Sequence, residues 1–526
     1  MTYANLLQGK TLFSKSSPQY SARVTEHWNH PMTTIPPDQR LSSGVPGLDL
    51  ILNGGLPAQS LYLIQGDPGV GKTTLALQFL LAGVQAGRTC LYITLAETQQ
   101  EVQQVVQSHG WSLEGIHLFE LSKIEQQLEP DAVNTVFHPA EVELTQISQI
   151  LISEMERVKP SLVVFDSLSE LRLLAQNSLR YRRQLLALKN HFARIRCTAL
   201  VLDDKTSEAG DLQVQSIAHG VVALERVVSD YGSDRRRLSI IKLRGATFRG
   251  GYHDYVILTG GITVFPRLVA AELRRSQDPS GSVGTGDADL DQLLGGGLDR
   301  GTSTLLMGPA GAGKSSLATF FALSAAKRQE RTSMFLFDES IATLTRRSLS
   351  LGMDLQPAIH QGLIEFTPVD PAEMSPGEFA HRIRTAVDHG SKQILIDSLN
   401  GYMHAMPAEN FLLLQLHELL TYLGQRGVTT LMTAAQQGLV GQMQSPFDLT
   451  YLADTVILFR FFEFSGAVRQ ALSIIKKRSG NHERTIRELQ MSKRGLTIGK
   501  CLTEFEGILT GTPRFSGQSG QMLKEA

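Results

Sequence analysis

Short apolar runs alternate with longer segments of helical periodicity in the first half of the chain. Glu101–His109 and Leu144–Arg157 repeat apolar residues at the three- and four-residue spacing of an amphipathic helix. Strands without a polar face that alternate with helices are typical of a parallel sheet covered on both sides, so the pattern predicts an α/β fold. The four predicted strands are Leu61–Gln65, Cys90–Leu95, Leu162–Phe165 and Thr198–Leu202.

Three polar segments interrupt this pattern and indicate the domain boundaries. Residues 1–40 mix Ser, Pro, Thr, Gln and His without an apolar stripe, so we expect a disordered arm. Residues 271–283 and 512–526 are polar and contain Gly and Ser, which is typical of a linker and of a flexible tail. The remaining chain forms two predicted domains of about 230 residues each, residues 41–270 and 284–511.

Each predicted domain contains the pattern G-x-x-x-x-G-K-[ST] between an apolar run and a helical segment. This strand–loop–helix context is that of a phosphate-binding P-loop. Its glycines let backbone N–H groups surround phosphate oxygens, its lysine reaches the β- and γ-phosphates, and the Thr73 or Ser315 hydroxyl binds Mg²⁺. The predicted nucleotide-binding residues are Gly66, Asp67, Gly69, Gly71, Lys72, Thr73 and Thr74, and Gly308, Gly311, Gly313, Lys314, Ser315 and Ser316.

The two loops belong to an internal duplication. Gly44–Leu56 resembles Gly286–Leu298, and the two segments are separated by the same offset as the loop lysines. Further along, Leu162–Ser167 resembles Ile394–Ser398 at a slightly shorter offset. A period this long predicts tandem domains and not a solenoid of short repeats.

Acidic residues follow the predicted strands in both repeats. Asp166 and Asp397 end apolar runs as a Walker B aspartate does, and their predicted role is to hold Mg²⁺ through water; the alternative is a helix N-cap. Glu97, and at the equivalent place Asp338 and Glu339, follow another strand. A carboxylate there can orient or deprotonate an attacking water, and the alternative is a cap in the first helical turn.

Composition narrows the function classes. The chain of 526 residues has 50 Lys and Arg against 51 Asp and Glu, a net charge of −1 and a pI near 6.9, so it lacks the basic excess of a nucleic-acid-binding protein. It contains no apolar run long enough to span a membrane. Cys90, Cys197 and Cys501 are widely spaced and form no metal or redox motif, which fits a cytoplasmic protein.

Together these motifs resemble the KaiC family, the RecA-superfamily ATPases and autokinases of the cyanobacterial clock and their bacterial relatives. The resemblance covers roughly residues 41–510 and includes Gly110-Trp111 and the segment Lys476–Glu488. It implies two stacked RecA-like domains, assembled as a double-ring homohexamer with ATP and Mg²⁺ between protomers. It also implies that two Lys-x-Arg pairs reach the neighbour's γ-phosphate, whereas the alternative is an exposed strand end. These pairs are Lys242 with Arg244 and Lys476 with Arg478.

The resemblance further implies slow ATP hydrolysis and a phosphorylation site. The family often has two carboxylates where this chain has Ala96-Glu97, so hydrolysis in the first domain rests on Glu97. Asp454 begins a segment that matches the strand after the family's phosphorylated pair, which places Thr450 at the phosphorylated position. A strand residue at a subunit boundary explains Thr450-Tyr451 equally well.

Partners follow less directly from the sequence. The short tail argues against binding of the clock protein KaiA. Residues 134–144 look more like those of non-clock relatives, which argues against binding of KaiB itself and leaves a KaiB-like or other signalling protein as the expected partner. The competing function is a RecA- or DnaB-type nucleic-acid-dependent ATPase. Its support is the arginine-rich segment from Arg180 to Arg196, together with Arg235–Arg237.

Overall fold

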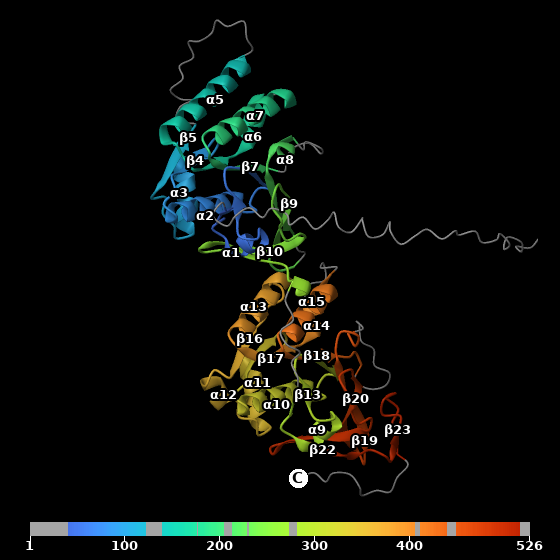
Figure 1. Cartoon of the computed structure of the whole chain (residues 1–526). Helices are drawn as coiled ribbons and strands as arrows, with labels where there is room; N and C mark the ends of the chain where they lie inside the picture. Colours follow the sequence, from blue (N-terminus) through green and yellow to red (C-terminus); the bar gives the residue numbers. More distant parts are fainter. Residues whose placement is uncertain are drawn as a thin grey trace, which may run out of the picture.

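The computed structural model describes residues 40–121, 139–175, 177–204, 213–228, 231–272, 281–404, 411–438 and 449–515. These residues form two α/β domains that follow one another along the chain (Figure 1). The predicted fold class, two tandem RecA-like domains with mostly parallel sheets, is confirmed.

The first domain is built on a nine-stranded sheet of order β11-β10-β9-β8-β3-β7-β6-β4-β5. The strands from β5 to β8 in this order are parallel, and β9, β10 and β11 continue the sheet in antiparallel pairs. The strands are β3 (Leu61–Gly66), β4 (Cys90–Thr94), β5 (Ile116–Glu120), β6 (Leu162–Asp166), β7 (Thr198–Asp204), β8 (Gly220–Val227), β9 (Arg235–Leu243), β10 (Tyr252–Leu258) and β11 (Gly261–Phe265).

Helices cover both faces of this sheet, as the apolar strands predict. Tyr62 and Ile64 belong to one buried cluster, and Leu61 and Leu63 of the same strand belong to another. The helices are α1 (Pro46–Ile51), α2 (Lys72–Gln85), α3 (Gln99–Ser108), α5 (Pro139–Val158), α6 (Leu168–Ala175), α7 (Ser178–Arg194) and α8 (Gln213–Ile217).

The second domain repeats the same strand order, β16-β15-β17-β18-β14-β19-β20-β21-β22, with the antiparallel strands again at one end. The two sequence repeats therefore also have the same order of strands in their sheets. Its strands are β14 (Ser303–Gly308), β15 (Arg331–Leu336), β16 (Ile364–Pro368), β17 (Ser391–Asp397), β18 (Thr429–Ala435), β19 (Thr455–Phe464), β20 (Ala467–Lys477), β21 (Ile486–Ser492) and β22 (Gly495–Cys501). Its helices are α9 (Ala288–Leu293), α10 (Lys314–Lys327), α11 (Ile341–Ser350), α12 (Gln356–His360), α13 (Pro376–Asp388), α14 (Leu399–His404) and α15 (Leu412–Gln425).

Short elements lie at the predicted boundaries. Three two-stranded sheets pair β1 (Arg40–Leu41) with β2 (Leu56–Pro57), β12 (Ser282–Val283) with β13 (Leu298–Asp299), and β23 (Phe505–Glu506) with β24 (Arg514–Phe515). The predicted linker thus ends in a paired strand, and the first residues of the predicted tail pair back onto the second domain, because Phe515 packs on Phe464 and Phe505.

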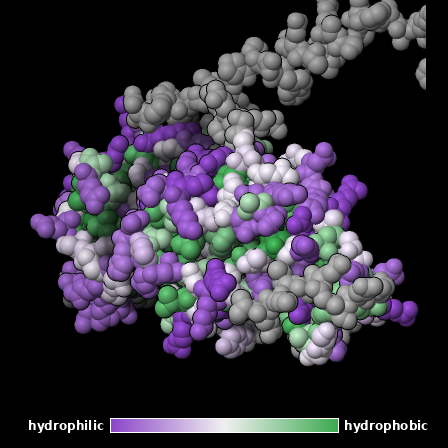
Figure 2. All heavy atoms as spheres, turned by 90° about the horizontal axis from the view of Figure 1, so that it is seen from below, coloured by the Kyte–Doolittle hydropathy of each residue, from purple (hydrophilic) through white to green (hydrophobic). Residues whose placement is uncertain are grey.

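The domains meet through α13, which packs against β10 and β11, and through α15, which packs against the turn Ala270–Glu272. Asp254 accepts a hydrogen bond from Gly377 N at 2.8 Å, and Arg235 donates to Pro371 O at 2.7 Å. Polar contacts and apolar ones thus both join the domains, because Phe265 also packs on His381 and Leu268 packs on the core of the second domain. The far end of the second domain, viewed from below in Figure 2, mixes hydrophilic and hydrophobic residues over its surface.

No helix among the residues that the structure describes is long and apolar enough to cross a membrane.

Candidate functional site: two P-loops and their carboxylates

Both predicted P-loops connect a central strand to a helix. In the first domain α2 begins at Lys72, directly after Gly71, whose φ of +94° belongs to the left-handed region. In the second, α10 begins at Lys314 after Gly313, whose φ is +95°. Each helix N-terminus therefore presents its unpaired N–H groups at the loop, which is the geometry that binds phosphate.

The other loop residues have matching places in the two domains. Gly66 and Gly308 end their strands, and a Cβ on either would collide with a neighbouring carbonyl oxygen, at 2.4 Å and 2.7 Å respectively. Gly69 and Gly311 both have a φ of +79°. The remaining candidates are exposed or half-buried at Asp67, Thr73 and Ser315, and buried at Thr74 and Ser316.

The lysine of each loop donates hydrogen bonds to carbonyl oxygens of the same loop. Lys72 Nζ donates to Gly66 O at 2.9 Å and to Asp67 O at 3.0 Å, and Lys314 Nζ donates to Gly308 O at 3.0 Å and to Pro309 O at 2.7 Å. Burial lowers the pKa of Lys314 to about 8, and the charge of Asp397 opposes this shift.

The predicted Walker B aspartate of the first domain is hydrogen-bonded to a P-loop residue. Asp166 Oδ2 accepts hydrogen bonds from Thr73 Oγ1 at 2.8 Å and from Tyr92 Oη at 2.6 Å. Burial raises the pKa of Asp166, and the two hydrogen bonds and the charge of Lys72 counter part of that rise.

A carboxylate and a hydroxyl in contact beside a phosphate loop fit Mg²⁺, which binds through one or two carboxylates, water and substrate phosphates. Among the described residues no group of three or more His, Cys, Asp or Glu side chains is placed to hold a metal without such phosphates.

The predicted Walker B aspartate of the second domain has a different hydrogen-bond donor. Asp397 Oδ1 accepts a hydrogen bond from Thr433 Oγ1, and within the described ranges no hydrogen bond joins Asp397 to Ser315. The peptide bonds Asp166–Ser167 and Asp397–Ser398 are both cis, so the local backbone is the same in the two repeats.

The candidate catalytic carboxylates occupy equivalent places. Leu95 N donates to Asp166 O, and Phe337 N donates to Asp397 O, so Ala96-Glu97 and Asp338-Glu339 follow equivalent strands. Glu97 is half-buried; its Oε2 is shielded from solvent and has no hydrogen-bond partner in the described part of the chain. Burial raises the pKa of Glu97, and the nearby charges of Asp166 and Glu101 add to that rise.

In the second domain both acids are engaged. Arg347 Nη1 contacts both carboxylate oxygens of Glu339 at 2.7 Å, and Asp338 accepts a hydrogen bond from Ser398 Oγ. The N-caps of α3 and α11 are Thr98 and Ser340, so neither Glu97 nor Glu339 is the N-cap of the helix that follows it.

The two Lys-x-Arg pairs bind main-chain carbonyls just before the central antiparallel hairpin of each sheet. Lys242 donates to Gln215 O, and Arg244 Nη2 donates to Ser216 O at 2.9 Å. In the second domain the equivalent pair binds the segment that carries the predicted phosphorylation site. Lys476 Nζ donates to Thr450 O at 2.7 Å, and Arg478 Nη2 donates to Tyr451 O at 2.8 Å.

Thr450 is half-buried, whereas Tyr451 is 51% exposed. Residues 439–448, directly before this pair, lie outside the described residues, as do residues 134–138 of the segment weighed for partner binding.

Several residues of the arginine-rich segment contact the protein itself. Arg182 donates to Ser216 Oγ at 3.1 Å, and Lys189 donates to Ile217 O at 3.0 Å. Arg237 pairs with Glu225 at 3.0 Å.

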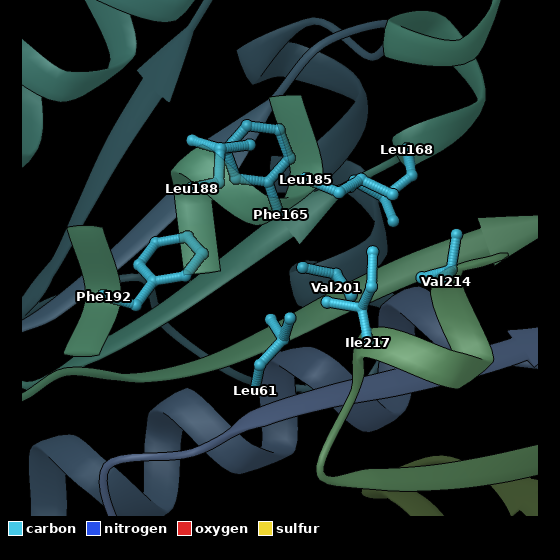
Figure 3. A pocket seen from close by; sticks show the side chains of 9 residues that line it. All are labelled: Leu61, Phe165, Leu168, Leu185, Leu188, Phe192, Val201, Val214 and Ile217. Carbon is cyan, nitrogen blue, oxygen red and sulfur yellow. The ribbon is translucent and has the colours of Figure 1, made fainter. Parts of the chain in front are cut away.

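A small cavity lies away from the loops, between β3, β6, β7 and the helices α6, α7 and α8 (Figure 3). It is lined only by apolar side chains, so it offers no group to bind a phosphate and belongs to the core. The lining residues are Leu61, Phe165, Leu168, Leu185, Leu188, Phe192, Val201, Val214 and Ile217.

Sequence reasoning missed three side chains of these sites. Asp204 lies two residues after the predicted strand Thr198–Leu202, at the same sheet edge as Asp166, and pairs with Lys72 at 2.7 Å. Its position after an apolar run was a usable signal. Tyr92 lies inside a buried strand, and Arg347 is eight positions from Glu339 on a separate helix, so neither spacing points to its partner.

Comparison with known proteins gives one consistent result. The family model described as "ATPase: KaiC" matches residues 41–269 and 283–502. The chain is 25% identical over 493 residues to the circadian clock protein KaiC3 of Synechocystis sp., covering 91% of this chain and 96% of that protein. It is 26% identical over 481 residues to the circadian clock oscillator protein KaiC of Synechococcus elongatus, covering 90% and 92% respectively. The chain therefore belongs to the KaiC family of RecA-like P-loop ATPases, as a divergent member.

Proposed function

We propose that this protein is a Mg²⁺-dependent ATPase that hydrolyses ATP slowly and acts as a signalling or timing switch. The observation that carries the proposal is the first site, where Thr73 and Asp166 are in contact beside a P-loop and Glu97 keeps a buried, unpartnered carboxylate oxygen. A carboxylate with a raised pKa is a better base toward water, which suits Glu97 to activate the attacking nucleophile.

The two sites are expected to hydrolyse at different rates. Glu97 is available in the first domain, whereas Arg347 neutralises Glu339 in the second. Single-site rates are measured in Lys314→Ala and Lys72→Ala backgrounds, which each leave one P-loop lysine. We expect Glu97→Gln to lower the first-site rate by about a hundredfold, the lower end of what general bases contribute. If neither Glu97→Gln nor the Asp338→Asn/Glu339→Gln double variant lowers hydrolysis, the assigned carboxylates are wrong.

The assembly proposed is an ATP-stabilised homohexameric double ring. In it Lys242 and Arg244 of the first domain, and Lys476 and Arg478 of the second, act on the neighbour's nucleotide, where such cations stabilise transition-state charge. Light scattering with ATP compares the wild type with Lys72→Ala/Lys314→Ala. A wild type that stays monomeric with ATP would refute the ring.

We also propose autophosphorylation at Thr450. Its main-chain carbonyl accepts a hydrogen bond from Lys476, so the main chain at Thr450 lies beside the Lys-x-Arg pair that we propose reaches the neighbour's nucleotide. Incubation with Mg-ATP is expected to add one phosphate per chain, lost in Thr450→Ala and in Glu339→Gln but kept in Tyr451→Phe. Absence of a phosphopeptide spanning Ser445 to Asp454 would leave an ATPase without kinase activity.

Two further proposals concern the cellular compartment and the binding partners of the protein. We place the protein in the cytoplasm, where its three free cysteines, two of them buried, stay reduced. KaiB-like or other signalling proteins are the proposed partners. A RecA- or DnaB-type nucleic-acid-dependent ATPase is the alternative, and single-stranded DNA that stimulates hydrolysis with a steep dependence on salt would favour it.

A further inference from the structure

The P-loop lysine of the first domain has an ion-pair partner, and among the described residues of the second domain Lys314 has no counterpart to it. Lys72 Nζ lies 2.7 Å from Asp204 Oδ1, and it also contacts two loop carbonyls. An ammonium group has three N–H donors, so these contacts account for all of them. The side chain of Lys72 is 9% exposed and that of Asp204 30% exposed, so solvent screens the pair only partly.

The fold places this carboxylate at the loop. Asp204 is the last residue of β7 and is paired in register with Gly66, the first residue of the P-loop. Its other oxygen, Oδ2, accepts a hydrogen bond from Ser169 Oγ at 3.2 Å, and the adjacent Asp203 pairs with Arg172 at 2.5 Å. The charge of Asp204 also reaches Asp166, whose pKa it helps to raise.

The second domain has the same backbone without the charge. There Gly308 is paired in register with Ala435, so alanine occupies the place of Asp204. Lys314 contacts two loop carbonyls as Lys72 does. The two sites therefore differ by one carboxylate beside the loop lysine.

We propose that Asp204 is a positioning residue of the first site, which holds Lys72 and competes with the nucleotide's β-phosphate for it. The inference rests on the proposed function, because it requires nucleotide at the first P-loop. When a nucleotide binds, Lys72 must exchange the carboxylate for a phosphate oxygen, and the displaced carboxylate stays close to the phosphate charge. Both effects lower the affinity of the first site for nucleotides that carry a β-phosphate.

The test measures ADP binding at the first site alone, in a Lys314→Ala background, by displacement of a fluorescent ADP analogue. Asp204→Asn keeps the shape and removes the charge, and it is expected to bind ADP about three- to tenfold more tightly, the range for loss of a partly screened charge contact. Asp204→Glu keeps the charge and is expected to stay near the wild type. AMP, which has no β-phosphate for the lysine, is expected to bind all three proteins equally.

The outcomes separate the two proposals. If the Lys314→Ala protein binds no ADP, the proposed function of the first site fails. If it binds ADP and Asp204→Asn binds no more tightly, the role of Asp204 fails while the site stands. An equal gain for ADP and AMP would indicate a change in the shape of the site and would also overturn the proposal.

A reciprocal experiment at the second site tests the same proposal if the Asp204 variants do not fold. In a Lys72→Ala background, Ala435→Asp is expected to weaken ADP binding at the second site by a similar factor, and the matched Ala435→Asn is expected to weaken it much less. Equal losses in these two variants would show that bulk, not charge, decides, and would contradict the proposal.

Discussion

Nucleotide binding at the second site is expected to weaken sharply in alkaline solution. The cause is Lys314, whose pKa burial lowers to about 8. Only the protonated lysine attracts phosphate, so above pH 8 the site must take up a proton when the nucleotide binds. At pH 9 about nine tenths of the lysine is neutral, and ADP affinity is expected to be about tenfold lower than at pH 7. The terminal phosphate, with a pKa near 6, is about nine tenths deprotonated at pH 7 and almost completely deprotonated at pH 9, so it does not cause this loss of affinity.

The assay is calorimetry of ADP binding to Lys72→Ala protein in two buffers of different ionisation enthalpy. The difference in heat gives the net number of protons taken up, which should approach about 0.9 per ADP at pH 9. At pH 7 it should be close to zero, because the terminal phosphate releases about as many protons as Lys314 takes up. Lys314→Arg is the matched control, because a guanidinium keeps its charge over this range. Constant affinity with no proton uptake in Lys72→Ala would refute the low pKa of Lys314.

Three further predictions concern single contacts. Arg347→Gln frees Glu339 and is expected to raise second-site hydrolysis severalfold in a Lys72→Ala background, whereas a fall would assign Arg347 a supporting role. Tyr92→Phe removes a hydrogen bond that lowers the pKa of Asp166, so the pKa of Asp166 should rise further. When the pH is lowered, Lys314→Ala/Tyr92→Phe protein should therefore lose Mg²⁺ activation of the first site at a higher pH than Lys314→Ala protein does. Gly377→Ala places a Cβ 2.7 Å from Asp254 Oδ2 and is expected to lower Tm by several degrees; Asp254→Ala in the same chain should restore part of the loss, and no restoration would exclude this clash as the cause.

Most of the fold could be read from the sequence because its signals are local. The four strands predicted in the first half are β3, β4, β6 and β7, with ends that differ by at most two residues. The P-loops could also be predicted, because the spacing of their glycines and lysine specifies both the turn and the start of the helix. The antiparallel strands β9 to β11 were not predicted, since their pairing depends on contacts between segments distant from the P-loop.

The candidate site could be predicted only in part, because only some of its residues are marked by local sequence signals. Positions after strands identified Asp166 and Glu97, because carboxyl ends of parallel strands share one edge. What each carboxylate touches depends on side chains from other elements: Tyr92 on Asp166, Arg347 on Glu339 and Asp204 on Lys72. The two sites therefore have nearly the same sequence motif but different charged side chains around it. The motif does not predict those neighbours.

The contact between Asp254 and α13 gives the molecule a mechanical connection. Asp254 of the first domain lies at the N-terminus of α13, and the 13 residues of that helix make a rod of about 20 Å. Only His389 and Gly390 separate the rod from β17, which ends at Asp397. One continuous stretch of backbone therefore connects the contact at Gly377 with the strand that ends at the predicted Walker B aspartate of the second domain. Displacement of the first domain at this contact is therefore expected to move the strand end that carries Asp397.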